Sequence, residues 1–531
     1  MHLETELKFI GTEDAIAQLR QSRELQELAG ARGARTVSQR AVYFDSERHD
    51  LWKAGYVLRV RNEGEGFAQT LKRISHADLA TRPEFKSEVV SATPDLATIP
   101  DSKVRWRVMQ LLKDRELVPQ FIIETRRTKV ILSPRKRVEI EAAFDSGVIM
   151  LPDESREQSI PVSEFELELL KGSVEDLFSM ARTLTASHPL TLSLSAKSER
   201  GFAMLSGEPY APVTAQKVAL LSEEPADDAL CAIFGNCLQH FLGNWHSVVL
   251  ANDAEGIHQM RVALRRFRSA VSLLDERQQD QMRELIADAK GFAFVLGQAR
   301  DYDVLLSEIV DPVANRLGQE SGVPHLSEPI LAHRRDGWAR VIEALNSEKF
   351  RSFVLDWAAV TYRRPWLAVS AEDNRVVAET RAFAKDNIER RVSQVCRAAA
   401  REGEPSIKEL HELRIKLKKL RYALDFFGSQ FSKTAVKHCQ KRLSKLQGVL
   451  GEVNDVSVAR NLIHQILLQS KAEPQSAELT YEAGLVLGWH SRRVAEKRKR
   501  VRKLLKKLVD PKALWKARPK RSAEDADAPT G

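Results

Sequence analysis

Up to about residue 205, hydrophobic and polar residues alternate with the period of a β-strand. Segments such as YVLRVRN from Tyr56, FIIETRR from Phe121 and EFELELLKG from Glu164 alternate charged with apolar residues between turn signals, a pattern typical of half-buried strands. EDAIAQLRQSRELQELAG from Glu13 and SVEDLFSMARTLTA from Ser173 have helical spacing instead. Residues 1–205 are therefore predicted to form an α+β domain with a large antiparallel sheet.

The second half of the chain has a different period. Residues 206–217, SGEPYAPVTAQK, contain two prolines and a glycine and are predicted to be a linker. From residue 218 to 509 almost every segment has helical spacing, which indicates an all-α domain. Residues 510–531 have the composition of a disordered tail, and a strongly basic segment at 497–507 precedes them.

The helical half contains an internal repeat. HQMRVALRRFRSAVSLL begins at His258 and HELRIKLKKLRYALDFF at His411, and LGQARDYDV from Leu296 is matched by LGEVNDVSV from Leu450. Because order and spacing both hold, we expect two pseudo-symmetric helical bundles, at about 218–365 and 366–509.

Composition narrows the class of protein. A chain of 531 residues is too long for one core, and no apolar run approaches the roughly 18 residues of a membrane span. The N-terminus lacks a signal-peptide pattern and the four cysteines form no CxxC pair, so a cytoplasmic protein that is neither exported nor inserted in a membrane is expected. A net charge of +9 indicates an anionic partner: nucleic acid, a phosphate polymer or a membrane surface.

Several predicted strands pair charges two residues apart, which places them on one face. The first strand does so with Glu4, Glu6 and Lys8, and others with Arg59 and Arg61. A sandwich would turn such faces to water, whereas a closed barrel would line its interior with both signs. A triphosphate bound by arginine and lysine, with Mg²⁺ or Mn²⁺ held by carboxylates, would need such an interior. The charge pattern alone leaves both arrangements open.

ETELK, at residues 4–8, fits the ExExK signature of the CYTH, or triphosphate tunnel metalloenzyme, family. Residues 2–202 resemble this family in further blocks in the same order: YFD from Tyr43, LRVR from Leu58, TLK from Thr70, RPEF from Arg82, EAAFDSG from Glu141, ELELL from Glu166 and SAKSERGF from Ser195. The resemblance implies an eight-stranded antiparallel β-barrel tunnel with flanking helices. It also implies metal-dependent hydrolysis of inorganic triphosphate to diphosphate and phosphate.

The same resemblance implies roles for residues of the strands. Phosphate groups would be bound by a catalytic set, Lys8, Arg59, Arg61 and Lys72, and a substrate-binding set, Arg82, Arg127, Lys129 and Lys197. Mg²⁺ or Mn²⁺ would be held by Glu4, Glu6, Glu141, Glu166 and Glu168. The choice of Arg127 over Arg126 depends on strand register, since a slip of one residue exchanges them.

The repeated histidine segments each carry a basic helix face. His258, Arg261, Arg265 and Arg268 lie within about 80° of arc on a helix, opposite an apolar stripe, and the second copy repeats this. Cations three and four residues apart repel each other, so two such faces call for an anion. Residues 218–505 resemble the CHAD family, a conserved histidine α-helical module, which implies binding of inorganic polyphosphate by His258, Arg261, Arg265, Arg266, Arg268, His411, Arg414, Lys418, Lys419 and Arg421.

The sequence thus predicts a cytoplasmic inorganic triphosphatase joined to a polyphosphate-binding domain, with association to polyphosphate granules as a further expectation. The alternatives are a non-catalytic polyphosphate scaffold, a thiamine triphosphatase and an adenylate cyclase. Nucleic acid is disfavoured, because the basic helix faces carry no interleaved aromatic residues for base stacking.

Overall fold

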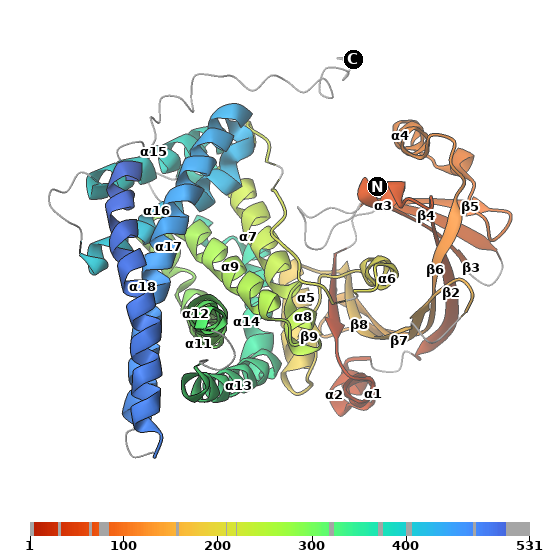
Figure 1. Cartoon of the computed structure of the whole chain (residues 1–531). Helices are drawn as coiled ribbons and strands as arrows, with labels where there is room; N and C mark the ends of the chain where they lie inside the picture. The colour runs from red at the N-terminus through yellow and green to blue at the C-terminus, as the bar shows by residue number, and fades with distance from the viewer. Residues whose placement is uncertain are drawn as a thin grey trace. The chain divides into compact units, whose positions relative to one another are not determined.

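The computed structural model of the chain describes residues 5–29, 33–62, 66–73, 84–154, 159–208, 210–218, 220–317, 323–369, 375–399, 406–470 and 474–505 (Figure 1). Contacts divide the chain into two compact units. The first consists of residues 1–216, 238–259 and 345–363, and the second of residues 217–237, 260–344 and 364–531. The predicted domains 1–205 and 218–509 stay a prediction.

The first unit is built on one antiparallel sheet. Its order is β5-β4-β3-β2-β6-β7-β8-β1-β9. The strands are β1 (Glu6–Ile10), β2 (Arg35–Asp45), β3 (Tyr56–Asn62), β4 (Phe67–Arg73), β5 (Glu84–Val89), β6 (Val118–Leu132), β7 (Glu139–Met150), β8 (Ile160–Lys171) and β9 (Thr191–Leu192).

Helices lie along the sheet, as Figure 1 shows. In the N-terminal region they are α1 (Glu13–Gln21), α2 (Arg23–Ala29), α3 (Asp50–Lys53), η1 (Leu96–Thr98), α4 (Ser102–Leu112), α5 (Val174–Ala186) and α6 (Lys197–Leu205). Alternation gives the sheet two different faces: the odd-numbered apolar residues of β1 and β8 share one face, where the Phe9 and Phe165 rings lie 5.9 Å apart. The charged residues therefore share the other face.

α6 packs against β6, β7 and β8 on the charged face of the sheet. Gly201 makes this close approach possible, because a Cβ atom there would lie 2.3 Å from the Phe121 ring. Phe121 in turn stacks on Tyr43 with ring centroids 4.6 Å apart. The N-terminal end of α6, which carries Lys197, is thus fixed beside the strands.

α14 (Glu348–Arg363) packs on α5 within the first unit, although the two helices are far apart in sequence. Arg363 Nε donates to Glu175 Oε2 at 2.6 Å, and Arg182 forms an ion pair with Asp356. The Phe178 and Tyr362 rings lie 5.5 Å apart. The first unit therefore includes a helix from beyond residue 345.

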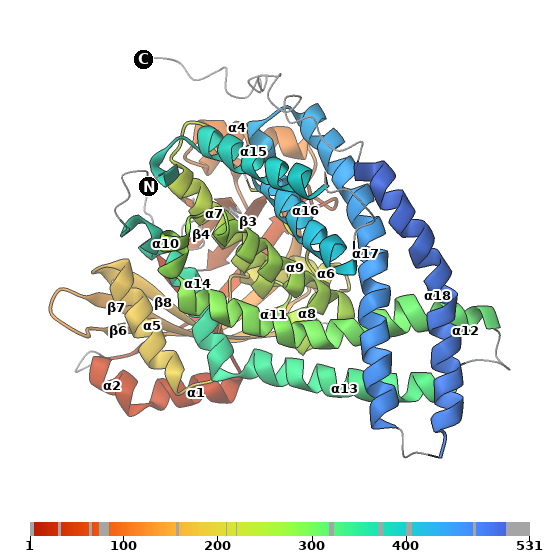
Figure 2. The same cartoon turned by 90° about the vertical axis from the view of Figure 1, so that its left-hand side faces the viewer.

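The remaining elements are helical. They are α7 (Ala226–Leu242), α8 (Trp245–Val249), α9 (Ala254–Val271), α10 (Glu276–Asp280), α11 (Arg283–Val304), the π-helix η2 (Leu305–Val310), α12 (Asp311–Leu317), α13 (Pro324–Asn346), η4 (Pro365–Leu367), η5 (Arg375–Val377), α15 (Thr380–Ala399), α16 (Ile407–Phe427), η6 (Gly428–Gln430), α17 (Lys433–Gln469) and α18 (Ser476–Leu505). α17 and α18 lie side by side in both views (Figures 1 and 2). Their apolar faces share a core that includes Ile463, Ile466, Leu479 and Val486.

An N-terminal antiparallel sheet with flanking helices, followed by a helical region, confirms the predicted fold class. The sheet has nine strands and not the predicted eight, because Thr191 and Leu192 add β9 beside β1. β5 and β9 end the strand order, and no ladder joins them in the described part of the chain, so the sheet is not a closed barrel there. The two pseudo-symmetric bundles stay a prediction.

Among the described residues, the structure contains no helix with the length and apolar character needed to span a membrane.

Candidate functional site

The charged face of the sheet lines a cavity of about 340 Å³. Register explains which residues reach it, since side chains two apart on a strand point to the same side. The predicted site residues found in its lining are Glu6, Lys8, Arg59, Arg61, Lys72, Arg127, Lys129, Glu141, Glu166, Glu168 and Lys197. Arg126, the neighbour of Arg127, is exposed. Glu4 and Arg82 lie outside the described residues.

Cations dominate the part of the wall formed by β3 to β6. Arg59 Nε is buried and has no hydrogen-bond partner within the described residues. Burial opposes the charge of Arg59, but Tyr43 and Glu84 outweigh it, so the pKa of Arg59 is raised. Burial and the charge of Arg59 lower the pKa of Lys72, although Lys72 forms an ion pair with Glu84. Tyr43 and Glu84 compensate these cations only in part, so this part of the wall is suited to binding an anion.

The opposite part of the wall carries three carboxylates in a row across neighbouring strands. Glu6 of β1 is directly opposite Glu168 of β8, which is directly opposite Glu141 of β7. Lys129 Nζ lies 2.6 Å from Glu141 Oε1. Like charges at directly opposite positions destabilise a sheet unless a cation compensates them. Carboxylate oxygens are the ligands that Mg²⁺ and Mn²⁺ prefer, so this acidic row fits a divalent metal.

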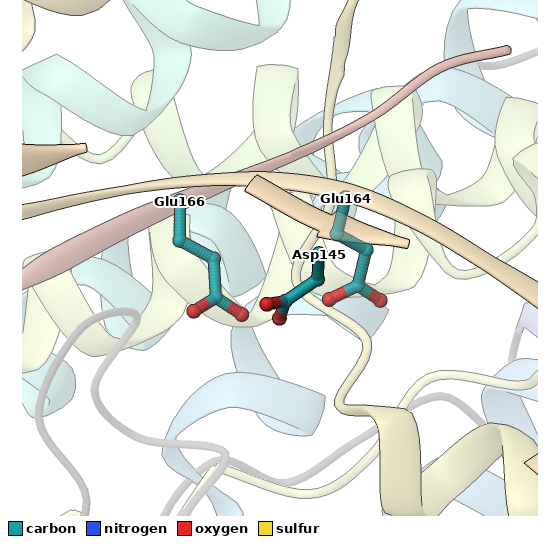
Figure 3. Close-up of side chains that lie close together, drawn as sticks. All are labelled: Asp145, Glu164 and Glu166. Atoms are coloured by element: carbon teal, nitrogen blue, oxygen red, sulfur yellow. The ribbon is translucent and has the colours of Figure 1, made fainter. Parts of the chain in front are cut away.

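A second group of acids lies deeper, with its three carboxylates on the same side of the strands (Figure 3). It consists of Asp145, Glu164 and Glu166, whose carboxylate oxygens lie within 4.8 Å of one another. Spacing alone would permit a metal here. The basic side chains that pair with all three acids argue for a different role.

Three cations neutralise these three acids. Arg127 Nε and Nη2 donate to Asp145 at 2.7 and 2.6 Å, and Nη2 also contacts Glu166 at 2.5 Å. Lys197 Nζ lies 2.8 Å from Asp145 and 2.9 Å from Glu166, and it forms an ion pair with Glu164. Arg200 forms a further ion pair with Glu164. We call these six residues the buried charge network.

Burial alone would raise the pKa of Glu166 and Asp145. Lys197 and Arg127 reverse this, so the pKa of both carboxyl groups is lowered. Glu166 raises the pKa of Lys197, and Asp145 and Glu166 raise the pKa of Arg127, in both cases against the effect of burial. These four shifts all favour the charged forms, and the positive partners already satisfy the acids that a metal would need. The acidic row of Glu6, Glu141 and Glu168 fits a metal better.

Three members of this network, Asp145, Glu164 and Arg200, are not among the site residues predicted from the sequence. Asp145 follows Glu141 by four residues in EAAFDSG, and Glu164 precedes Glu166 by two in EFELEL. Both spacings are even, so period two could have placed them on the cavity face. Arg200 is one helical turn beyond Lys197 in SERGF, but nothing in the sequence indicates that it meets Glu164.

In the helical half, cations from both repeats lie close enough to perturb one another. The charges of Arg265, Arg414 and Arg261 add to burial in lowering the pKa of Lys418 to about 7, against the attraction of Asp455. Arg261 Nη2 lies 3.7 Å from Asp301 Oδ1. We call Arg261, Arg265, Arg414 and Lys418 the helical basic cluster.

Parts of this cluster are buried without partners. Arg261 Nη1 and Arg265 Nε have no hydrogen-bond partner in the described part of the chain. Gly297, in the LGQARD segment, leaves room for Arg261, since a Cβ atom there would lie 2.8 Å from Arg261 Nη1. The two repeated motifs of the sequence thus meet at this cluster.

The other predicted anion-binding residues have varied surroundings. Arg266 is 5% exposed, donates to Asn236 Oδ1 at 2.8 Å and lies over the Phe426 ring, the contacts of a packing residue. His411 Nδ1 lies 3.2 Å from Asn454 Oδ1, and Arg421 donates to Gln447 Oε1 at 3.0 Å. Arg268 is exposed, and His258 and Lys419 are half-buried.

Comparisons with known proteins identify both parts of the chain. The model of the CYTH domain matches residues 2–202, and that of the CHAD domain matches residues 232–464. Residues of the chain are 29% identical over 202 positions to an inorganic triphosphatase of Haemophilus influenzae, a match that covers 37% of this chain and 55% of that relative. The chain thus spans about half the length of this relative.

Two further matches cover nearly the whole length of the similar protein. An uncharacterised protein of Mycobacterium tuberculosis is 24% identical over 543 positions, covering 97% of this chain and 98% of that protein. A solved CHAD domain from the plant Ricinus communis has a TM-score of 0.48 and 27% identity, covering 56% of this chain and 98% of the plant domain.

Proposed function

We propose that this chain, which belongs to the proteins that join a CYTH domain to a CHAD domain, hydrolyses inorganic triphosphate to diphosphate and phosphate. The supporting observation is a single cavity with cations on β3 to β6 and an acidic row on β1, β8 and β7. A triphosphate needs both, because its oxygens bind arginine and lysine while its divalent metal binds carboxylates. Similarity to a named inorganic triphosphatase supports the same conclusion.

Different residues of the cavity would bind phosphate, position the basic side chains and hold the metal. Arg59, with its unpaired Nε, and Lys72 would bind phosphate oxygens and stabilise the charge that develops on them in the transition state. The buried charge network would keep Lys197 and Arg127 in place beside the substrate. A divalent cation held by Glu6, Glu141 and Glu168 would neutralise phosphate charge and make the attacking water more acidic. No covalent nucleophile is required.

The test is phosphate release from inorganic triphosphate, ATP and thiamine triphosphate with Mg²⁺ or Mn²⁺. We expect release from inorganic triphosphate that stops with EDTA and falls about 100-fold in Glu6→Gln and in Glu168→Gln. Glu124→Gln is the matched control, because Glu124 is a carboxylate of β6 that pairs with Arg40 at 3.0 Å and is absent from the cavity lining.

Two outcomes would count against this proposal. Equal activity in Glu6→Gln, Glu168→Gln and wild type would remove the acidic row from the reaction. No release from any of the substrates by a folded protein would favour the non-catalytic scaffold.

We also propose that the helical half binds inorganic polyphosphate at the helical basic cluster. Buried, unpartnered guanidinium nitrogens on Arg261 and Arg265, close to Arg414 and Lys418, support a site for an anion with many oxygens. Such binding would bring the enzyme to polyphosphate granules in the cytoplasm.

Titration with long-chain polyphosphate tests this second function. We expect Arg261→Met and Arg414→Met each to weaken binding at least about tenfold. Arg460→Met, at an exposed position of α17, should bind like the wild type. Unchanged affinity in both cluster variants would show that polyphosphate does not bind at the helical basic cluster.

A further inference from the structure

α18 has an exposed apolar surface on the side away from its core. Tyr481 is 68% exposed, Leu485 36% and Trp489 47%. Leu479 and Val486 of the same helix are buried in the core shared with α17. Figures 1 and 2 show α18 beside α17 at the edge of the helical elements. Three large exposed apolar side chains on one helix are typical of an interaction surface.

These side chains form a stripe with a charge at each end. At 100° per residue, Glu478, Tyr481, Leu485, Trp489 and Arg492 lie within about 80° of arc. Glu478 is exposed, and Arg492 has an exposed side chain whose contact with Glu496, at 3.5 Å, is a weak one within the same helix. We call these five residues the α18 stripe.

The order of residues in the α18 stripe is symmetric about Leu485. Tyr481 and Trp489 lie four residues to either side of it, and Glu478 and Arg492 lie seven residues to either side. A half-turn about Leu485 therefore places an aromatic residue on an aromatic residue and an acid on a base. Interfaces between identical subunits have this property when they are two-fold symmetric.

We propose that two copies of this chain associate through α18, with the two helices antiparallel about a two-fold axis at Leu485. Glu478 then pairs with the partner's Arg492 at both ends, and Tyr481 packs on the partner's Trp489 between them. A parallel arrangement would place Glu478 opposite Glu478 and Arg492 opposite Arg492. Repulsion between these like charges disfavours it. Charge complementarity therefore selects a second, antiparallel copy as the occupant.

Glycines beside the α18 stripe leave room for such a contact. A Cβ atom at Gly484 or Gly488 would meet no other atom within 4 Å. Large aromatic side chains of the partner can occupy this space. One helix face buries less than the roughly 1,000 Å² of a stable interface, so we expect a reversible dimer in the micromolar range.

Sedimentation of the full chain from about 1 to about 100 µM tests the proposal, since this range brackets a micromolar dissociation constant. Wild type should pass from monomer to dimer. Glu478→Arg and Arg492→Glu should each weaken dimerisation at least about tenfold, because each opposes like charges twice. The double variant Glu478→Arg/Arg492→Glu restores both pairs and should recover the wild-type constant within about threefold. Glu343→Arg, at an exposed position of α13, is the matched control.

The double variant separates this arrangement from a general loss of structure, because it combines two disruptive changes and is expected to recover. A monomer at all concentrations, or a double variant weaker than both single variants, would overturn the proposal. Dimerisation that appears only after removal of residues 506–531 would assign the α18 stripe to that segment and would overturn it equally.

Discussion

Lys197 is a cation of the cavity lining and contacts all three acids of the buried charge network. Its ammonium group lies within ion-pair distance of three carboxylates, and its side chain is only 16% exposed. Burial alone would favour the neutral amine, but Glu166, Glu164 and Asp145 raise the pKa of Lys197. Because each partner holds the other in its charged form, removal of one charge is felt by the whole buried charge network.

Lys197→Met should lower the free energy of unfolding at pH 7 by about 3–5 kcal/mol, because it leaves buried carboxylates without a counter-charge. The loss should shrink towards pH 4. In the wild type the pKa of Glu166 and Asp145 is lowered, so their contribution to stability is present above the usual carboxyl pKa and declines as the pH falls. In the variant these groups take up protons more readily when folded, so it gains stability over the same range.

Urea unfolding at pH 7 and pH 4 measures this difference. Lys171→Met is the matched control, since Lys171 is 65% exposed and pairs with Glu139 at 3.2 Å on the surface. A deficit that is equal at both pH values would show that Lys197 contributes through packing and not through charge.

At the residue level, alternation in the strands predicted which charged side chains share a face, but it left open whether that face lines a cavity. The period is local, so Glu6 and Lys8 or Arg59 and Arg61 point together wherever the strand lies. Ion-pair partners could not be predicted in this way. Arg127 meets Asp145 through the β6–β7 register, and Lys197 meets Glu166 through the packing of a helix on the sheet.

α6 is the element that carries Lys197 to the strands, and Gly201 sets its distance from them. Phe121, which a Cβ atom at Gly201 would overlap, is fully buried and stacks on Tyr43 of the cavity wall. A side chain at this position must therefore move α6 or displace the wall of the cavity.

Gly201→Ala should destabilise the protein by about 1–3 kcal/mol through overpacking. It should also weaken substrate binding, seen as a higher KM for inorganic triphosphate. Gly291→Ala is the control in a helix where a Cβ atom meets nothing, and there alanine should be neutral or slightly stabilising. If Gly201→Ala behaved like Gly291→Ala, the approach of α6 to Phe121 would not constrain the site.

The helical basic cluster, whose residues lie on α9 and α16, predicts a pH dependence of polyphosphate binding. Arg265, Arg414 and Arg261 surround Lys418, with Asp455 as the opposing charge, and its pKa is about 7. As the pH rises through 7 the free protein loses this charge, whereas a bound polyanion favours the protonated form. Affinity for long-chain polyphosphate should therefore fall between pH 6 and 9, by up to about tenfold per pH unit.

Titrations at several pH values measure this slope in the wild type and in Lys418→Met. The variant should bind more weakly at pH 6 and show a flatter profile, while Lys437→Met, at an exposed position of α17, should keep the wild-type slope. The same steep slope in Lys418→Met would assign the proton to another group.

Periodicity predicted whether a long segment is a helix or a strand, but it did not predict the short or irregular elements. Helical spacing predicted α9 and α16 because apolar residues recur on one face throughout. β9 could not be predicted, since two residues carry no period of their own and pair only because β1 lies beside them. The π-helix at Leu305–Val310 also left no pattern in the sequence.

At the scale of the whole molecule, the chain crosses repeatedly between its two compact units. Residues 238–259 and 345–363 belong to the first unit, although they come from the helical half. Composition and period predicted two halves because those properties change near residue 205. They could not predict this interleaving. The sequence of α5 indicates an amphipathic helix, but it does not indicate which element covers its apolar face.

A fragment of residues 1–216 should be less stable than the same region in the full chain. It lacks α14, so Phe178 loses its contact with Tyr362, and Glu175 and Arg182 lose Arg363 and Asp356. We expect a lower melting temperature and stronger binding of a hydrophobic dye by the fragment. Adding residues 345–363 through a flexible linker should reverse both effects, and failure to do so would show that α14 is dispensable to the first unit.

The interleaved order of the chain has a consequence for its synthesis. The ribosome completes the whole sheet before residue 216, yet the helix that covers α5 ends only at residue 363, which is 363 − 216 = 147 residues later. At about 5–20 residues per second, the nascent first unit waits roughly 7–30 seconds with the apolar face of α5 uncovered. During that interval it is a natural client for chaperones that bind nascent chains.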